Sequence, residues 1–262
     1  MAPLRIALLQ GPAGALPGRR EGLAALEAAA RTAAAGGARL LVASELFLSG
    51  YATDPAVHAE PADGPGARAV AAIAADHGLF LAYGYPERDG TEVYNAVRLI
   101  TPYGHPLANY RKTHLFGDFE RRSFTPGDTT VVQADVDGLR VGMLICYDVE
   151  FPELVRAHAL AGTELLLVPT ALMRPYEFVA RTLVPARAYE SQLYIAYANR
   201  VGAEGEHHFA GLSCLAAPDG TVRARAGDGG EDLLLAEVDP ARIAGARRDN
   251  TYLADLRPEL YA

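Results

Sequence analysis

The chain has 262 residues, half of them hydrophobic, which is enough for one large domain with a sizeable core. Its formal net charge is −8 and no basic run exceeds two residues, which argues against nucleic acids and anionic membranes as partners. Only two cysteines are present, and no apolar run approaches the roughly 20 residues of a membrane span. We therefore expect no disulfide framework and no membrane anchor, and we expect the protein in a reducing cytoplasm.

Short apolar runs of strand length recur along the chain and alternate with helical stretches. The N-terminal segment indicates a first strand and not a signal peptide. The expected strands are 4–10, 38–44, 79–85, 94–100, 107–112, 129–136, 139–147, 164–169, 193–200, 212–218 and 233–238. The expected helices are 19–37, 66–78, 151–162 and 175–191, the last with a bend expected at Pro185. The expected surface loops are 60–67 and 202–208.

This order of elements predicts a single α/β domain over residues 1–262. No short repeat and no Ser/Gly linker divides the sequence. Residues 138–147 and 164–169 are apolar almost throughout, which suits central strands covered on both faces. We expect one large mixed sheet or two stacked sheets, flanked by helices.

A thiol and a carboxylate lie where predicted strands end. Cys146 stands about five residues before a helix, where nearby amides favour a thiolate and an oxyanion. The alternative is a buried cysteine packed as a small hydrophobe. Glu45 follows an apolar strand and lies among Leu and Phe, so desolvation should raise its pKa toward that of a general base. The alternative is an ordinary solvated glutamate.

Lys112 ends a third strand and is the single lysine in a chain with 23 arginines. A compact ammonium can contact one developing negative oxygen, whereas a planar guanidinium prefers bidentate partners. Codon bias is the alternative explanation. Together, a base, a cation and a thiol are the groups that attack on an amide or nitrile carbon requires.

Motifs of other enzyme classes are missing from the sequence. It contains no G-x-S-x-G elbow, no phosphate-binding P-loop and no complete dinucleotide fingerprint. The seven histidines form no zinc pattern, and we expect His207 and His208 to be solvated in a polar loop. Cys214 lies inside an apolar strand, which indicates a core position.

Three stretches resemble motifs of the nitrilase, or carbon–nitrogen hydrolase, superfamily. They are ASELFLSGY around Glu45, NYRKTHLF around Lys112 and ICYDVEFPE around Cys146, and the similarity extends over essentially the whole chain. The resemblance implies an α/β fold, a four-layer αββα sandwich of two mixed β-sheets flanked by helices. It also implies a homodimer or higher homo-oligomer that uses no metal and no organic cofactor.

The same resemblance implies roles for individual residues. It makes Cys146 the nucleophile, Glu45 the general base and Lys112 the cation that stabilises the oxyanion. Glu120, in the loop after the lysine, is implied as a second carboxylate that positions the substrate and Lys112.

Further implied positions lie next to these groups. Backbone groups at Tyr147, Thr170 and Ala171 are expected to bind the substrate or its oxyanion. Ser44 stands where many members of the superfamily have proline, which loosens a turn but removes no reacting group.

Within the superfamily the chain is most similar to aliphatic amidases that act on ω-amino amides, such as 5-aminopentanamidase. The likeness lies in residues 83–88, 109–127, 144–153 and 167–178. It implies a cysteine-dependent amidase that converts a small aliphatic primary amide to acid and ammonia through a thioester. Acidic residues near the reactive positions are expected to attract a substrate ammonium group, with Glu120, Asp118 and Glu150 as candidates.

Alternatives of the same superfamily remain open: N-carbamoylputrescine amidase, ω-amidase, (R)-stereoselective amidase and nitrilase. A nitrilase is less favoured, because Tyr147-Asp148 stands where many nitrilases have Trp-Glu. Two classes without catalysis of their own are a binding subunit on this scaffold and an accessory domain that delivers ammonia to a synthetase. Intact Glu45, Lys112 and Cys146 disfavour the first, and the chain length leaves no room for a fused synthetase.

Overall fold

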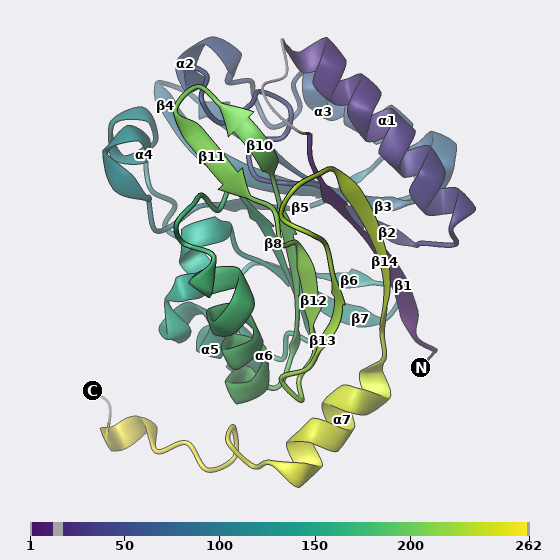
Figure 1. Cartoon of the computed structure of the whole chain (residues 1–262), viewed down its shortest axis with the longest axis vertical. Helices are drawn as coiled ribbons and strands as arrows, with labels where there is room; N and C mark the ends of the chain where they lie inside the picture. The colour runs from purple at the N-terminus through teal and green to yellow at the C-terminus, as the bar shows by residue number, and fades with distance from the viewer. Residues whose placement is uncertain (1, 13–17, 261–262) are drawn as a thin grey trace.

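The computed structural model describes residues 2–12 and 18–260, and its core is a pair of stacked six-stranded sheets (Figure 1). The first sheet has the order β14-β1-β2-β3-β4-β5 and the second has the order β13-β12-β9-β8-β7-β6. The first contains β1 (Leu4–Gln10), β2 (Leu40–Val42), β3 (Phe80–Asp89), β4 (Glu92–Ile100), β5 (Pro106–Arg111) and β14 (Asp232–Val238). The second contains β6 (Gln133–Val136), β7 (Leu139–Met143), β8 (Leu165–Thr170), β9 (Tyr194–Asn199), β12 (Cys214–Ala216) and β13 (Val222–Arg225).

Both sheets have the same mixed topology. Three parallel strands stand side by side in each, β1-β2-β3 in the first sheet and β7-β8-β9 in the second. The flanking strands pair antiparallel to them. The carboxyl ends of the parallel strands therefore supply comparable turns in the two halves of the molecule, and Glu45 and Cys146 lie in two of these turns, after β2 and β7.

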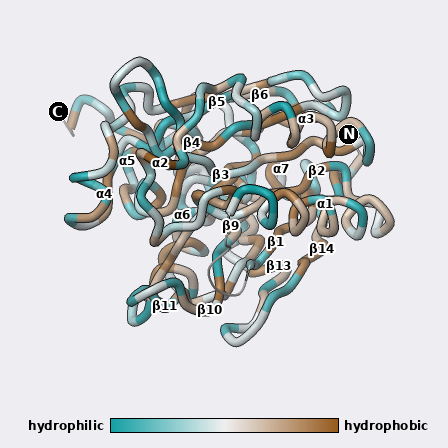
Figure 2. Tube along the Cα trace, turned by 90° about the horizontal axis from the view of Figure 1, so that it is seen from above, coloured by the Kyte–Doolittle hydropathy of each residue, from teal (hydrophilic) through white to brown (hydrophobic). Residues whose placement is uncertain are grey.

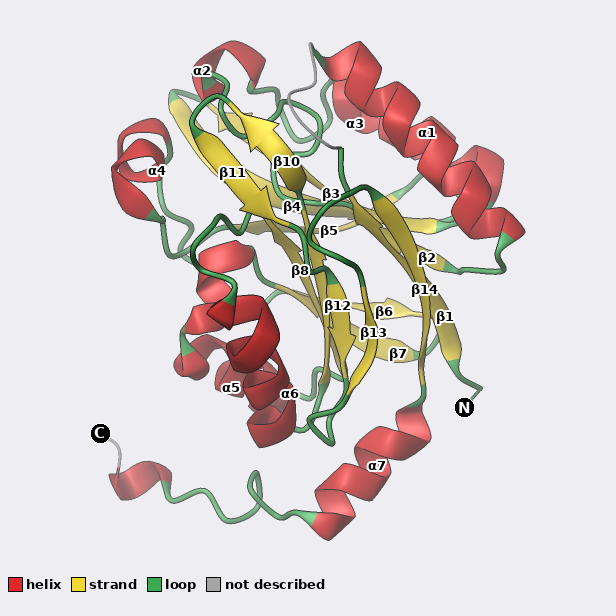
Figure 3. Ribbon diagram, viewed as in Figure 1, coloured by secondary structure: helices red, strands yellow, loops and turns green. Residues whose placement is uncertain are grey.

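Helices cover the outer faces of both sheets (Figure 3). The first sheet carries α1 (Arg19–Ala35) and α3 (Pro65–His77), and the second carries α5 (Pro152–Leu160) and α6 (Val184–Ser191). The remaining helices are α2 (Pro55–His58), α4 (Gly117–Ser123) and α7 (Pro240–Asp249). In the part of the chain that the structure describes, no helix combines the length and the apolar character needed to cross a membrane.

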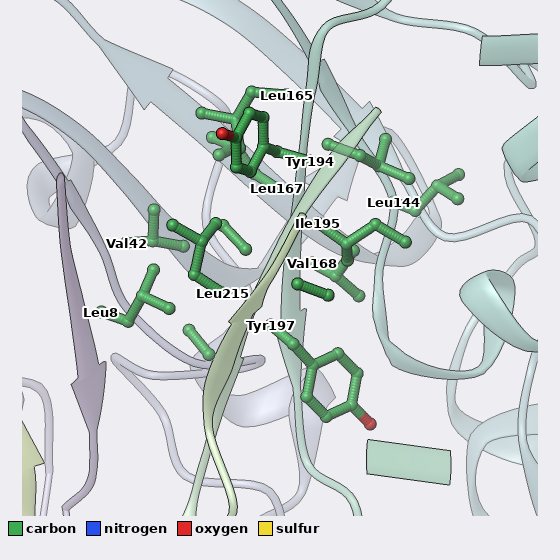
Figure 4. Packing of buried hydrophobic residues seen from close by; sticks show 14 of the residues in the cluster. Leu8, Val42, Leu144, Leu165, Leu167, Val168, Tyr194, Ile195, Tyr197 and Leu215 are labelled. Carbon is green, nitrogen blue, oxygen red and sulfur yellow. The ribbon is translucent and has the colours of Figure 1, made fainter. Parts of the chain in front are cut away.

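Alternation along the strands explains the layers. In β2, Leu40 and Val42 belong to the cluster between the sheets, whereas Leu41 belongs to the cluster under α1 and α3. Figure 4 shows Leu8 and Val42 of the first sheet pointing toward Leu215 of the second. In Figure 2, the strands inside the molecule are largely hydrophobic, and many of the outer loops are hydrophilic. This arrangement confirms the four-layer αββα sandwich expected from the sequence.

The expected helix over 175–191 is wrong at its start. A π-turn spans Val179–Leu183, and α6 begins only at Val184, directly before Pro185. Proline lacks the N–H that would continue an α-helical ladder, so the irregular turn lies where the bend was predicted.

Two expected loops also differ from prediction. Residues 202–208 lie in a hairpin of β10 (Val201–Glu204) and β11 (His207–Ala210), in which Gly205 has a φ of 58° that glycine adopts without strain. Within 60–67, Glu60 is buried and its carboxylate accepts hydrogen bonds from two amides at the start of α3. The polar composition of these segments indicated neither the hairpin nor the buried carboxylate. The strand β13 was also not predicted.

Candidate active site

Lys112 lies between two buried carboxylates contributed by other parts of the chain. Its Nζ donates to Glu45 Oε1 at 2.6 Å and to Glu120 Oε1 at 2.8 Å. All three side chains are fully shielded from solvent. Glu45 follows β2, Lys112 follows β5 and Glu120 lies on α4. The structure thus brings together three of the residues that the sequence predicted for the site.

The turn that carries Glu45 is closely packed against β3. A Cβ atom on Gly84 would lie 2.4 Å from the amide nitrogen of Leu46 and 2.7 Å from the carbonyl oxygen of Ser44, so only glycine fits there. The Ser44 hydroxyl is buried and donates to the carbonyl oxygen of Gly11 at 3.1 Å. Ser44 therefore helps to anchor the turn.

Burial raises the pKa of the Glu45 carboxyl to about 7. The nearby charge of Glu120 acts in the same direction, while Lys112 and the amide of Asn95 oppose it. Asn95 Nδ2 donates to Glu45 Oε1 at 2.7 Å. Among the described residues, Oε2 of Glu45 is buried without a hydrogen-bond partner. Glu45 therefore has a pKa suited to a base near neutral pH and one free oxygen to accept a proton.

Lys112 remains charged despite its burial. Desolvation would lower the pKa of its ammonium, but the carboxylates of Glu120 and Glu45 outweigh that effect and hold the pKa well above its usual value. Its backbone N–H donates to the carbonyl oxygen of Asn95 at 2.8 Å, which fixes the end of β5 against β4. The ammonium of Lys112 therefore carries a positive charge in a buried environment, where its interactions are screened less than in water.

Glu120 is fully buried, not an exposed loop charge. Besides Lys112, its Oε1 accepts from the Tyr51 hydroxyl at 2.8 Å, and its Oε2 accepts from the Phe116 N–H at 2.7 Å. All its identified partners are donors, so the carboxylate is held in one orientation beside the lysine.

Cys146 begins a 3₁₀ turn, Cys146–Glu150, three residues after β7 ends. Its φ of 46° is a left-handed conformation that costs a non-glycine residue free energy. Burial raises the pKa of the thiol well above its usual value, and the Glu45 carboxylate adds to this, while Lys112 and Thr170 oppose it. The nearby amides, which were expected to favour a thiolate, do not outweigh burial, so the reaction needs a base to take the proton of the thiol.

Asp148 ties the cysteine turn to the segment that carries Lys112. Its Oδ2 accepts from the Ile145 N–H at 3.1 Å and from the Tyr110 hydroxyl at 2.9 Å. Its Oδ1 accepts from the Thr113 hydroxyl at 3.0 Å and from the His114 N–H at 2.9 Å. Asp148 is fully buried, so its four hydrogen bonds replace water and stabilise the strained turn.

The three implied backbone positions lie around the cysteine turn. Tyr147 is half-buried, with its ring packed edge-on against Phe116 and Phe151. Thr170 ends β8, and its hydroxyl donates to the Tyr197 hydroxyl at 3.1 Å. Ala171 follows directly and is buried. Their part in binding an oxyanion stays a prediction.

The acidic residues expected at the pocket mouth occupy different environments. Asp118 is 81% exposed in its side chain, and its nearest ion-pair partner is Arg121 at 3.6 Å. Glu150 is half-buried, and burial raises the pKa of its carboxyl while Lys112 and Arg187 lower it. The charge of Glu150 therefore acts on the site, whereas Asp118 belongs to the surface.

Several further residues of the site were missed at the level of sequence. Asn95, Tyr51 and Arg200 contact Glu45 or Glu120, and Asp148 and Tyr197 support the cysteine turn and Thr170. The available signal was weak: an asparagine in the apolar stretch 94–100 and an aspartate within ICYDVEFPE. Across residues 2–12 and 18–260, no group of three or more His, Cys, Asp or Glu side chains is arranged to hold a metal ion.

Comparison with known proteins gives the family. A family model described as carbon–nitrogen hydrolase matches residues 5–248. A Pseudomonas protegens protein described as "Hydrolase in pqqF 5′region" is 50% identical over 229 residues, which cover 86% of this chain and 80% of the relative. An (R)-stereoselective amidase from a Pseudomonas species is 41% identical over 228 residues, covering 85% of this chain and 81% of the relative.

Solved structures of the amidase from Nesterenkonia sp. AN1 share the fold. A double variant of it in complex with acrylamide matches with a TM-score of 0.89 at 35% identity, covering 99% of this chain and 96% of that one. A variant with glutamate replaced by glutamine shows covalent addition of the acetamide moiety of fluoroacetamide at the active-site cysteine. The present chain belongs to the carbon–nitrogen hydrolase family, the nitrilase superfamily. The family, the fold and the enzyme class expected from the sequence are thereby confirmed.

Proposed function

We propose that this carbon–nitrogen hydrolase is an amidase that converts a small aliphatic primary amide to a carboxylic acid and ammonia. The observation that carries the proposal is the buried Glu45–Lys112–Glu120 cluster, whose charges act on the Cys146 thiol. Two relatives of known activity, the Pseudomonas (R)-stereoselective amidase and the Nesterenkonia amidase, support the same reaction.

In the first half of the proposed reaction, Glu45 takes the proton of the Cys146 thiol while the sulfur attacks the amide carbon. The oxygen of the tetrahedral intermediate gains negative charge, which Lys112 and the backbone N–H of Tyr147 stabilise. Glu45 returns the proton to the departing nitrogen, so that ammonia leaves and a thioester remains.

In the second half, Glu45 takes a proton from water and the hydroxide attacks the thioester carbon. The carbon–sulfur bond breaks, the thiol regains a proton, and the acid is released. Glu120 holds Lys112 and the substrate in position throughout. The net reaction consumes one amide and one water and yields one acid and one ammonia, so no metal or redox partner enters the balance.

For the substrate we propose an amide with a terminal amine, of the kind that 5-aminopentanamide represents. Half-buried Glu150, on the same turn as Cys146, would supply the carboxylate that attracts an ammonium group at the far end of the substrate. Exposed Asp118 is not part of this proposal. The alternatives are a carbamoyl amine, an ω-amide of a dicarboxylic acid, a chiral amide and a nitrile.

The proposal is tested by catalytic efficiency on 5-aminopentanamide, pentanamide, N-carbamoylputrescine and a simple nitrile, scored by ammonia release. We expect 5-aminopentanamide to be the best substrate, and Glu150→Gln to reduce its advantage over pentanamide while Glu153→Gln, an exposed neighbour, does not. Pentanamide as an equal or better substrate removes the amine preference and leaves the amidase. Carbamoylputrescine as the best substrate identifies a carbamoyl amidase, and a nitrile as the best substrate refutes the proposed reaction.

We also propose that the active form is a cytoplasmic homodimer. Large apolar side chains stay exposed on or beside α5 and α6, namely Leu160, Phe178 and Tyr189. A second copy of the chain would cover them. Analytical ultracentrifugation decides between dimer and monomer, and a monomer at micromolar concentration would contradict this part of the proposal.

A further inference from the structure

Arg200 and Glu204 form an ion pair inside the protein, next to the segment that begins with Glu45. Arg200 lies between β9 and β10 and is fully buried, and Glu204 at the end of β10 is 2% exposed. One guanidinium nitrogen of Arg200 donates to Glu204 Oε1. A buried ion pair costs desolvation free energy, so a contribution to stability alone does not explain why these two residues are here.

Among the described residues, the other side-chain hydrogen bonds of the pair lead to the segment that begins with Glu45. The other terminal nitrogen of Arg200 donates to the backbone carbonyl of Glu45 at 3.4 Å. Glu204 Oε2 accepts from the backbone N–H of Tyr51 at 2.7 Å and of Ala52 at 3.1 Å. The pair therefore holds both ends of the segment from Glu45 to Ala52.

Tyr51 continues the connection to the second carboxylate. Its hydroxyl donates to Glu120 Oε1, the same oxygen that accepts from Lys112. Its ring packs edge-on against Phe209 and His207 of β11, and Arg200 lies over the Phe209 ring at 5.4 Å. The β10–β11 hairpin and the Lys112 cluster are thus joined through one tyrosine.

We propose that Arg200 and Glu204 are positioning residues that set the place of Glu45 directly and of Glu120 through Tyr51. A guanidinium suits this place because two separate nitrogens of its rigid fork contact the carbonyl of Glu45 and the carboxylate of Glu204, and the compact ammonium of lysine does not reproduce that geometry. This inference rests on the proposed roles of Glu45 and Glu120. It assigns to the hairpin a part in catalysis that its polar, loop-like sequence conceals.

The first test compares Arg200→Lys and Glu204→Gln with the wild type. The matched control is Arg39→Lys, because Arg39 also joins a carboxylate, Asp137, to a backbone carbonyl, but on the surface and away from the site. For Arg200→Lys we expect kcat/KM to fall ~10–100-fold, as displacement of a catalytic group by about 1 Å does. For the control we expect no change beyond about twofold.

The pH dependence of kcat/KM is a second measurement. It would not change if Arg200 had only a structural role. The charged or titratable groups that interact with Glu45 are Lys112, Glu120, Cys146, Tyr51 and Arg200. If Arg200→Lys moves the cation away from Glu45, the acid limb of kcat/KM shifts to higher pH. Alkylation of Cys146 by iodoacetamide should slow in parallel, because the same base takes the thiol proton.

A double-mutant cycle tests the connection through Tyr51. We expect Tyr51→Phe to lower kcat/KM, and the double variant with Glu204→Gln to lose less than the product of the two single losses. Strict multiplicativity would remove Tyr51 from the connection and overturn that part of the inference.

Unchanged kcat/KM and an unchanged acid limb, with only a lower melting temperature, would show that the pair is structural and overturn the inference. If Arg200→Lys does not fold, Glu204→Gln decides by the same criteria, since its amide oxygen still accepts from Tyr51. A wild type that hydrolyses no amide counts against the proposed function, and the alkylation rates then still test the positioning.

Discussion

Lys112 Nζ lies 2.6 Å from Glu45 Oε1, and neither side chain contacts solvent. A charged hydrogen bond of this length in a buried site is strong, and each partner decides the protonation of the other. The carboxyl of Glu45 titrates near neutral pH while the lysine stays charged. A carboxyl and an ammonium, the groups proposed as base and oxyanion-stabilising cation, thus act together on the Cys146 thiol.

Lys112→Arg should preserve the charge and lose activity by ~100-fold or more, because the oxyanion contact depends on geometry. The larger guanidinium cannot enter the space between Glu45 and Glu120, where the lysine is fully buried. Steady-state kinetics measure the loss, with Arg111→Lys as a control on the adjacent, partly exposed arginine. Near-normal turnover by Lys112→Arg would show that the single lysine is an accident of composition.

Cys146→Ala should abolish turnover and leave the fold intact, since alanine is smaller than cysteine and the turn is held by Asp148. Intact-mass spectrometry with an electrophilic amide should show one adduct on the wild type and none on the variant. Circular dichroism checks the fold. An adduct on Cys214, which is buried in β12, would overturn the assignment of the nucleophile.

Glu45→Gln and Glu120→Gln should fail at different steps. Without Glu45 no base remains to take the thiol proton, so acylation slows by several orders of magnitude. Without the charge of Glu120 the lysine is less well held, so substrate binding weakens and slow adduct formation persists. Single-turnover kinetics followed by mass spectrometry separate the two, and full activity in both variants would exclude both carboxylates from the chemistry.

Activity should fall as the pH drops below about 7, because the pKa of the Glu45 carboxyl is raised to about 7 and only its ionised form accepts a proton. A carboxyl with a raised pKa is protonated over a wider acidic range, so the loss begins close to neutrality. Asn95→Ala removes a donor to Glu45 and should move the acid limb of kcat/KM to higher pH. A wild-type limb near pH 4 would mean that another group controls it.

Gly84→Ala should lower both stability and activity. The new methyl group would lie 2.4 Å from the amide of Leu46, and the turn that carries Glu45 must move to make room. Overpacking of this kind costs about 1–3 kcal/mol of unfolding free energy. Thermal unfolding and kcat/KM measure the two effects, and Gly229→Ala, which meets no neighbouring atom, is the control. Equal behaviour of the two variants would contradict this account of the turn.

The sequence by itself determined the α/β architecture, and it predicted that Glu45, Lys112 and Glu120 belong to one site, where the structure brings them into contact. Strand-length apolar runs that end in a single Glu, Lys or Cys are a local pattern. Neighbouring residues determine both the burial of a strand and the polarity of its end. The pattern predicted that Glu45 would be desolvated, and its pKa is raised for that reason. It could not predict the pKa of the Cys146 thiol, which depends on burial and on a carboxylate about 100 positions away.

Only the tertiary structure decided which residues hold the reacting groups in place. Tyr51 contacts Glu120 across 69 positions, and Arg200 contacts Glu45 across 155. Such contacts leave no periodicity in the sequence, because each depends on how two sheets and a hairpin pack together. The same holds for residues 202–208, whose polar composition indicates a loop while pairing with neighbouring backbone makes a hairpin. Local pattern therefore identifies the chemistry, and long-range packing supplies the geometry on which that chemistry depends.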